Sequence, residues 1–387
     1  MDSGVILMIQ RILASKTPLT LSGAPAGFLP WLMTDLARGA TPRAVFIAAD
    51  DQAMRAMAET AHYFAPELEV LTFPAWDCLP YDRASPSLRS TSERMACLAA
   101  LQRTPDKPQL VVTTINAATQ RTLTPFRIRQ LSARLVAGER IDRDRLAALL
   151  QANGYVRSDT VADAGEYAVR GSLVDLFPSG EPHGLRLDFF GDEIESVRSF
   201  DPADQRSIAK VDGFTLLPAS EALLDEDGIK RFRSRYRDHF GATATGDPLY
   251  QAISEGRRLA GMDHWLPLIE EKLATFFDHI GSDALIVRDA GSTGAGPWSG
   301  WVGGAVVDRV VVCTICVGGV DLYCGVRAWL DYGDGAGWNG RESSGVVVAE
   351  SGAAGLSCAS GSGESWQRGC WIYDDVSNRL RRPAFLT

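Results

Sequence analysis

The chain has 387 residues, more than one ordinary domain holds, so we expect two or three domains. Its formal net charge of −9 argues against broad electrostatic binding to nucleic acid or to an anionic membrane. No signal peptide is evident, and no apolar stretch approaches the length of a membrane-spanning helix. The first 290 residues contain two cysteines, Cys78 and Cys97, which is typical of a reducing compartment. We therefore expect a cytoplasmic protein without membrane contact.

Residues 1–120 have the pattern of an α/β domain. Apolar runs at 43–48, 69–73 and 110–114 predict buried strands, and a helical pattern covers 52–63. Strands separated by helices indicate a parallel sheet with helices on both of its faces.

The strand predicted at 19–22 is followed by a glycine-containing loop, Gly23 to Gly27, where a phosphate-binding loop would lie. A working loop needs a lysine for the phosphates and a hydroxyl for magnesium. The residues after Gly27 are Phe28, Leu29 and Pro30, so both groups are absent and the proline removes a backbone donor. We interpret the stretch as a degenerate nucleotide loop.

An aromatic loop bounded by prolines covers residues 74–82 at the end of a predicted strand. This position would allow Trp76 and Tyr81 to stack on a ligand or a base, but a structural loop that these rings pack fits it better. Ser90 to Glu93 are expected to cap the helix that follows.

Residues 165–200 predict a β-meander. Leu185, Leu187 and Phe189 alternate with Arg186 and Asp188, which is the pattern of a half-buried strand. Upstream, three apolar side chains are expected on one face: Tyr167, Val169 and Leu173. The meander should therefore form a small antiparallel sheet with a charged open face.

The composition changes abruptly after about residue 291. This part holds about half of the glycines, five of the seven cysteines and six of the nine tryptophans. Cys313 and Cys316 have the spacing of zinc ligands, but a second such pair is lacking and valines surround them, so no metal site is expected. A genuine low-complexity tail and translation in a shifted reading frame both fit this change.

Five stretches, in the same order, resemble the N-terminal part of bacterial transcription-repair coupling factors (Mfd), which is itself similar to the repair protein UvrB. They are Leu21–Ala24, Trp76–Asp82, Gly165–Pro178, Arg186–Ile194 and Gly261–Leu268. The resemblance covers the first 290 residues.

The resemblance implies an α/β fold in which a degenerate P-loop NTPase-like domain with a parallel sheet carries an inserted β-rich (α+β) domain that docks UvrA. The NTPase-like domain would comprise residues 1–120 and, incompletely, 211–290, with the inserted domain at 121–210. Residues 291–387 would form an irregular or disordered tail that is not a native domain.

The resemblance also implies what this chain does. It would recruit UvrA in transcription-coupled nucleotide-excision repair, whereas the family contacts RNA polymerase and DNA through domains missing from this chain. No enzyme activity and no cofactor are expected, because the phosphate loop lacks its lysine and Arg288-Asp289-Ala290 lacks the glutamate of UvrB-like proteins. Two alternatives remain open: a divergent UvrB-like ATP-dependent helicase or DNA damage clamp, and an inactive truncated product.

Three residues are carried over as UvrA contacts. Arg170 matches the family's Arg-Gly pair, Arg157 lies next to the second interface arginine, and Phe177 would be an aromatic anchor. Each also has an ordinary explanation, as a solvated strand residue for the arginines and as a core residue for Phe177.

Overall fold

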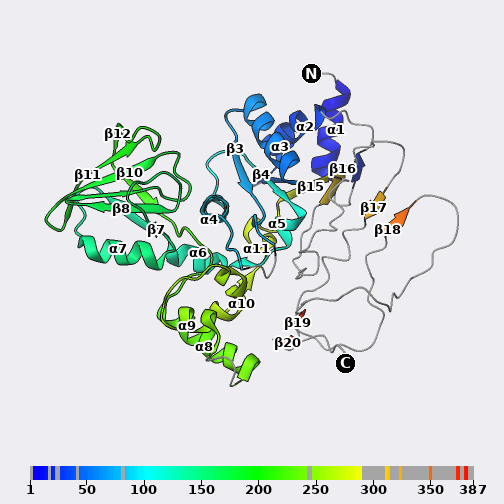
Figure 1. Ribbon diagram of the computed structural model, residues 1–387. Helices are drawn as coiled ribbons and strands as arrows, with labels where there is room; N and C mark the ends of the chain where they lie inside the picture. The colour runs from blue at the N-terminus through cyan, green and yellow to red at the C-terminus, as the bar shows by residue number, and fades with distance from the viewer. Residues whose placement is uncertain are drawn as a thin grey trace.

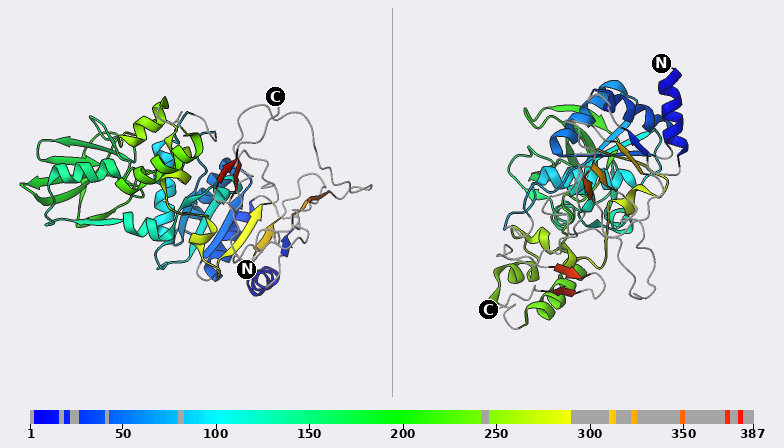
Figure 2. Two further views of the ribbon diagram at one scale, coloured as in Figure 1. Left: turned by 90° about the horizontal axis from the view of Figure 1, so that it is seen from below. Right: turned by 90° about the vertical axis from the view of Figure 1, so that its right-hand side faces the viewer.

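The computed structural model describes residues 3–15, 19–21, 27–40, 43–79, 83–241 and 246–289, together with five short strands in the tail. An α/β domain and a β-rich domain lie side by side, with α6 (Pro125–Leu131) between them (Figures 1 and 2). A group of helices, from α8 (Glu226–Phe240) to α10 (Leu266–Ile269), lies below the α/β domain in the view of Figure 1.

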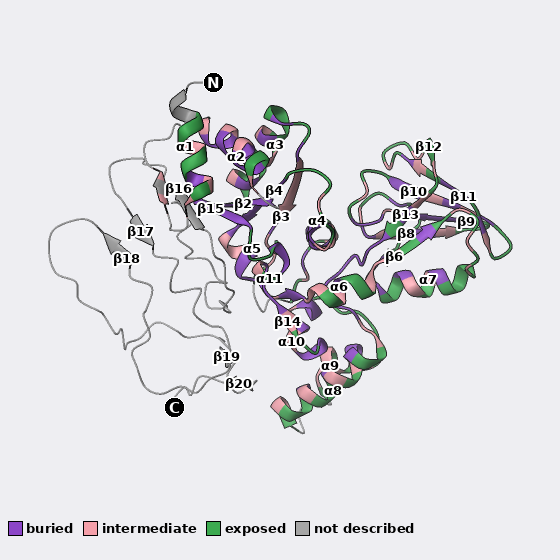
Figure 3. Cartoon of the chain, turned by 180° about the vertical axis from the view of Figure 1, so that it is seen from behind, coloured by how far each residue is buried: buried purple, intermediate pink, exposed green. Residues whose placement is uncertain are grey.

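The α/β domain is built on a six-stranded sheet with the order β1-β16-β15-β2-β4-β3, in which the paired strands are parallel. The bounds are β1 Leu19–Leu21, β2 Arg43–Ala48, β3 Glu69–Phe73, β4 Gln109–Thr114, β15 Leu285–Asp289 and β16 Val310–Cys313. Strands β2 and β4 are buried along their whole length (Figure 3). The prediction of a parallel sheet is confirmed.

Helices cover both faces of this sheet, as the sequence predicts. One face packs against α1 Ser3–Ala14, α2 Phe28–Gly39 and α3 Asp51–Phe64. The other face packs against α4 Leu88–Leu101, α5 Ile115–Thr119, α6 Pro125–Leu131 and α11 Phe277–Ile280. The expected cap of α4 is wrong: the helix begins at Leu88, and the Ser87 side chain caps it by accepting from the Ser90 amide.

The second face of the sheet gains a further layer from residues 222–280. Its elements are α8 Glu226–Phe240, α9 Pro248–Ser254, the 3-10 helix Met262–Trp265, α10 Leu266–Ile269 and the short strand β14 Leu273–Ala274, which pairs with β5 Thr122–Leu123. Phe232, Tyr236 and Ile253 join the same apolar core as Val45 and Phe73.

The β-rich domain is a six-stranded sheet with the order β12-β11-β10-β9-β8-β7. The bounds are β7 Val156–Arg157, β8 Glu166–Arg170, β9 Leu173–Leu176, β10 Gly184–Phe190, β11 Glu193–Phe200 and β12 Ser207–Val211. Neighbours from β8 to β12 are antiparallel, so the meander is confirmed. Helix α7 Arg143–Ala152 packs on one face through Leu146 and Leu150.

One predicted face assignment is wrong. Tyr167 and Val169 pack on the face that α7 covers, but Leu173 pairs with Arg170 and therefore lies on the opposite face. The reason is the two-residue turn Gly171–Ser172, in which Gly171 has a φ of 60°. Alternation cannot be counted through such a turn, because its two flanking residues lie opposite each other and share a face.

A further strand, β13, does not join the sheet of the α/β domain. Strand β13 Gly213–Leu216 pairs with β6 Ala133–Val136, and Phe214 and Leu216 belong to the apolar core under the six-stranded meander sheet. Leu123 and Ile128, in contrast, belong to the core of the α/β domain. The domain bounds drawn from the sequence stay a prediction.

The tail contributes β16 to the α/β sheet and two further antiparallel pairs. These are β17 Leu322–Cys324 with β18 Val348–Glu350, and β19 Ile372–Asp374 with β20 Arg379–Arg381. Among the described residues, no helix is both long and apolar enough to span a membrane.

Candidate protein-docking face

The face of the meander sheet opposite α7 carries charged side chains. Asp175 on β9 lies opposite Arg186 on β10, and Arg170 on β8 lies two positions beyond Ala168, the residue opposite Asp175. Residues at every second position of a strand share a face, so these three side chains project from the same side of the sheet. They cannot join the covered core, whose apolar side chains occupy the alternate positions.

The carboxylate of Asp175 binds both arginines. It is 1% exposed and accepts two parallel hydrogen bonds from Arg186, from Nε at 2.7 Å and from Nη2 at 3.0 Å. It also accepts a hydrogen bond from Nη2 of Arg170. Such a fork is among the stronger ion pairs in proteins. One buried negative charge therefore fixes two guanidinium groups and leaves a net positive charge at the surface.

Arg186 is held at the floor of this face. Its guanidinium lies 5.0 Å from the centre of the Phe200 ring, and its hydrogen bond to Asp175 raises its pKa. Arg170 is the outer member of the pair, because 46% of its side chain is exposed. The inner arginine thus supports the sheet, whereas the outer one has free donors for a partner.

Phe190 is a large apolar side chain that this face exposes. It is the last residue of β10, pairs with Glu193 before the Gly191–Asp192 turn, and is 80% exposed. It continues the alternation of Arg186 and Asp188, so it lies on the same face as Arg170. Sequence analysis missed Phe190 and the shared carboxylate; counting positions from Arg186 would have found the ring.

Phe177, the predicted aromatic contact, is half-buried and packs against the small apolar group formed by Val161, Ala168 and Phe200. Arg157 is exposed on the short edge strand β7 and pairs with Tyr167, whose ring lies in the covered core. In this register the Arg157 side chain projects from the face of the sheet that α7 covers. The structure therefore does not bring Arg157 and Arg170 to one face.

The predicted nucleotide loop lies mostly outside the described residues, including Gly23. Gly27 precedes α2 with helical backbone angles, φ −71° and ψ −16°, and a Cβ there would have no atom within 4 Å. Phe28 begins α2, and its ring lies 5.3 Å from that of Trp31. The first turn of α2 is thus apolar, with Leu29 and Pro30 buried.

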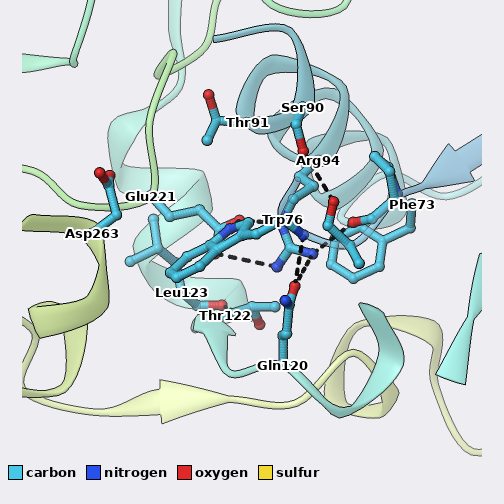
Figure 4. Close-up of polar contacts among 12 residues, drawn as sticks. Phe73, Trp76, Ser90, Thr91, Arg94, Gln120, Thr122, Leu123, Glu221 and Asp263 are labelled. Carbon is cyan, nitrogen blue, oxygen red and sulfur yellow. Dashed lines mark hydrogen bonds and ion pairs between the residues drawn. The ribbon is translucent and has the colours of Figure 1, made fainter. Parts of the chain in front are cut away.

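A second polar cluster lies where the chain passes between the two domains (Figure 4). Arg94 on α4 is fully buried and forms an ion pair with Glu221, which is 1% exposed. Its Nη1 donates to the Pro74 carbonyl at 2.8 Å and to Oε1 of Gln120 at 2.9 Å. Pro74, Gln120 and Glu221 come from different segments of the chain. The cluster therefore links the segment that leaves the α/β domain, at Gln120, to the segment that returns to it, at Glu221.

Trp76 belongs to this cluster. Its indole Nε1 donates to Oε1 of Glu221 at 3.4 Å, and its ring packs edge-on against His264 at 5.7 Å. These contacts favour the structural interpretation of the 74–82 loop, in which Tyr81 lies outside the described residues. Within the described ranges, no group of three or more His, Cys, Asp or Glu side chains is placed to hold a metal ion. The side chains of Cys313 and Cys316 lie outside those ranges.

Comparison with known proteins gives this face a context. Residues 133–221 match the family described as UvrB interaction domain. The resemblance to an N-terminal coupling-factor module is confirmed. The transcription-repair-coupling factor of Haemophilus influenzae is 38% identical over 221 residues, which is 57% of this chain and 19% of that protein.

Two further coupling factors show the same extent of similarity. That of Escherichia coli is 35% identical over 258 residues, 66% of this chain and 22% of its own length. That of Myxococcus xanthus is 35% identical over 255 residues, 61% of this chain and 20% of its own length. The chain thus spans about a fifth of the length of the coupling factors it matches. The mixed α/β fold contains the predicted β-rich domain.

Proposed function

We propose that this chain docks UvrA through the open face of the meander sheet and so serves transcription-coupled nucleotide-excision repair. The observation that carries the proposal is the Arg170–Asp175–Arg186 cluster inside the residues that match the UvrB interaction domain. A pair of guanidinium groups fixed by a buried carboxylate is pre-organised to donate to carboxylates of a partner. Pre-organisation lowers the entropy cost of binding.

Phe190 completes the proposed contact. A partner that covers this ring removes most of its exposed apolar surface from water, which is how aromatic residues dominate many interfaces. The arginines would orient the docked partner, and burial of the ring would supply affinity for it. Phe177, which is packed against Phe200, would support the face from below rather than contact the partner.

We further propose that the chain itself neither hydrolyses ATP nor needs a nucleotide. The support is the apolar first turn of α2, where Phe28, Leu29 and Pro30 take the place of the phosphate-binding lysine and hydroxyl. The polymerase contacts and translocase activity of complete coupling factors would then belong to parts outside the matched region. ATP hydrolysis by this chain, abolished by a substitution between Gly23 and Phe28, would instead support the UvrB-like alternative.

The docking proposal is tested by titrating UvrA with the chain and two charge-reversal variants. Arg170→Glu should weaken binding at least tenfold, because it places a carboxylate beside Asp175 and against the partner's acidic groups. Arg145→Glu is the matched control, since Arg145 is exposed on α7, which covers the opposite face of the sheet. Equal binding by the two variants would remove Arg170 from the site, and no binding by the unaltered chain would end the proposal.

A further inference from the structure

The open face carries more positive charge than the two arginines bound to Asp175. Arg186 lies opposite Arg198 on β11, and Arg198 lies opposite Lys210 on β12. Side chains that lie opposite each other share a face, with Cβ atoms about 5 Å apart. Three cations therefore form one row across three strands, about 10 Å long from the spacing of strands.

The two cations of this row beyond Arg186 are not balanced by an ion pair within the described residues. Arg198 and Lys210 are exposed, and no ion pair joins either one to any residue of the described part of the chain. Asp188 lies on the same face, where it pairs with Ser196 and so lies diagonal to Arg198. Like charges at directly opposite positions destabilise a sheet. Negatively charged groups of a bound partner would therefore relieve the repulsion within this exposed row.

We infer that the docking face extends across β11 and β12, and that the row Arg186–Arg198–Lys210 receives an acidic segment of the docked protein. This inference rests on the proposed function and adds the second half of its interface. The row begins at the arginine that Asp175 holds, so it is continuous with the Arg170 contact.

A protein segment fits the row better than nucleic acid does. The same face carries the apolar side chains of Leu173 and Phe190 and the carboxylate of Asp188, and the chain as a whole has a net charge of −9. A phosphate backbone would be repelled by that carboxylate and would leave the Phe190 ring without a partner. An acidic strip bordered by apolar groups would match every one of these features.

The test compares two double variants of the full chain that change its charge equally. Arg198→Glu with Lys210→Glu reverses the row, whereas Arg134→Glu with Arg145→Glu reverses two exposed arginines on β6 and α7. At low salt the first variant should associate with UvrA ~10-fold more slowly, with little change in dissociation, and the difference should shrink at high salt. The control should stay within ~2-fold of the unaltered chain.

The outcomes separate the inference from the function it extends. If the row variant binds like its control while Arg170→Glu still weakens binding, the extension is wrong and the docking proposal survives. If Arg170→Glu also has no effect, both are wrong. Specific binding of a DNA duplex that the row variant abolishes would overturn the acidic segment as the occupant. Should the reversal disturb folding by circular dichroism, the Arg198→Gln and Lys210→Gln pair should still slow association ~3-fold.

Discussion

The buried pair of Arg94 and Glu221 makes the sharpest prediction about stability. Arg94→Met removes the guanidinium but keeps most of the side-chain volume and a favourable contact with Phe73, whose ring centre lies 4.2 Å from the guanidinium carbon. Glu221, 1% exposed, then keeps the Trp76 indole at 3.4 Å as a donor and has no counter-charge. Breaking a buried pair in this way costs about 3–5 kcal/mol.

Glu221→Gln should cost a similar amount, because it leaves the buried guanidinium of Arg94 without a negative charge. The double variant removes both charges, so its cost should fall short of the sum of the single costs by about 2 kcal/mol or more. A stability of about 5–15 kcal/mol leaves room for these losses to be measured.

The assay is urea unfolding of the full chain, followed by far-ultraviolet circular dichroism, for all four members of the cycle. An unchanged dependence of the free energy on urea would show that the variants alter stability and not the extent of unfolding. Additive single costs, or a loss below about 1 kcal/mol for Arg94→Met, would refute the claim that this pair acts as one buried unit.

Two further predictions concern packing and pH. Burial lowers the pKa of His279 from 6.5 to about 4. The free energy of unfolding should therefore fall by about 3 kcal/mol as the pH drops through this range, because only the unfolded chain gains the proton. Urea unfolding of His279→Gln should lack this part of the pH dependence. In Gly184→Ala the new Cβ would lie 2.3 Å from the Phe200 ring, and a loss of about 1–3 kcal/mol is expected in thermal unfolding, whereas Gly27→Ala, with open space, should change nothing.

Much of the architecture follows from the amino-acid order alone. The apolar runs that become β2, β3 and β4 and the alternation along β10 each predict the element that forms, because burial on both faces or on one face leaves its own period in the sequence. The resemblance to a coupling-factor module rests in the same way on the ordered motifs in these elements and in the loops between them. Arg170 was already visible as a charged residue of the meander.

The tertiary structure decided which side chains meet. That Leu173 lies with Arg170, and that one carboxylate holds Arg170 and Arg186, depends on where the chain turns and on the register between strands, and neither leaves a period in the sequence. The same holds for Arg94, which finds Glu221 across 127 residues of chain. The local sequence pattern determines which helices and strands form, whereas only the tertiary packing determines which charged side chains come into contact.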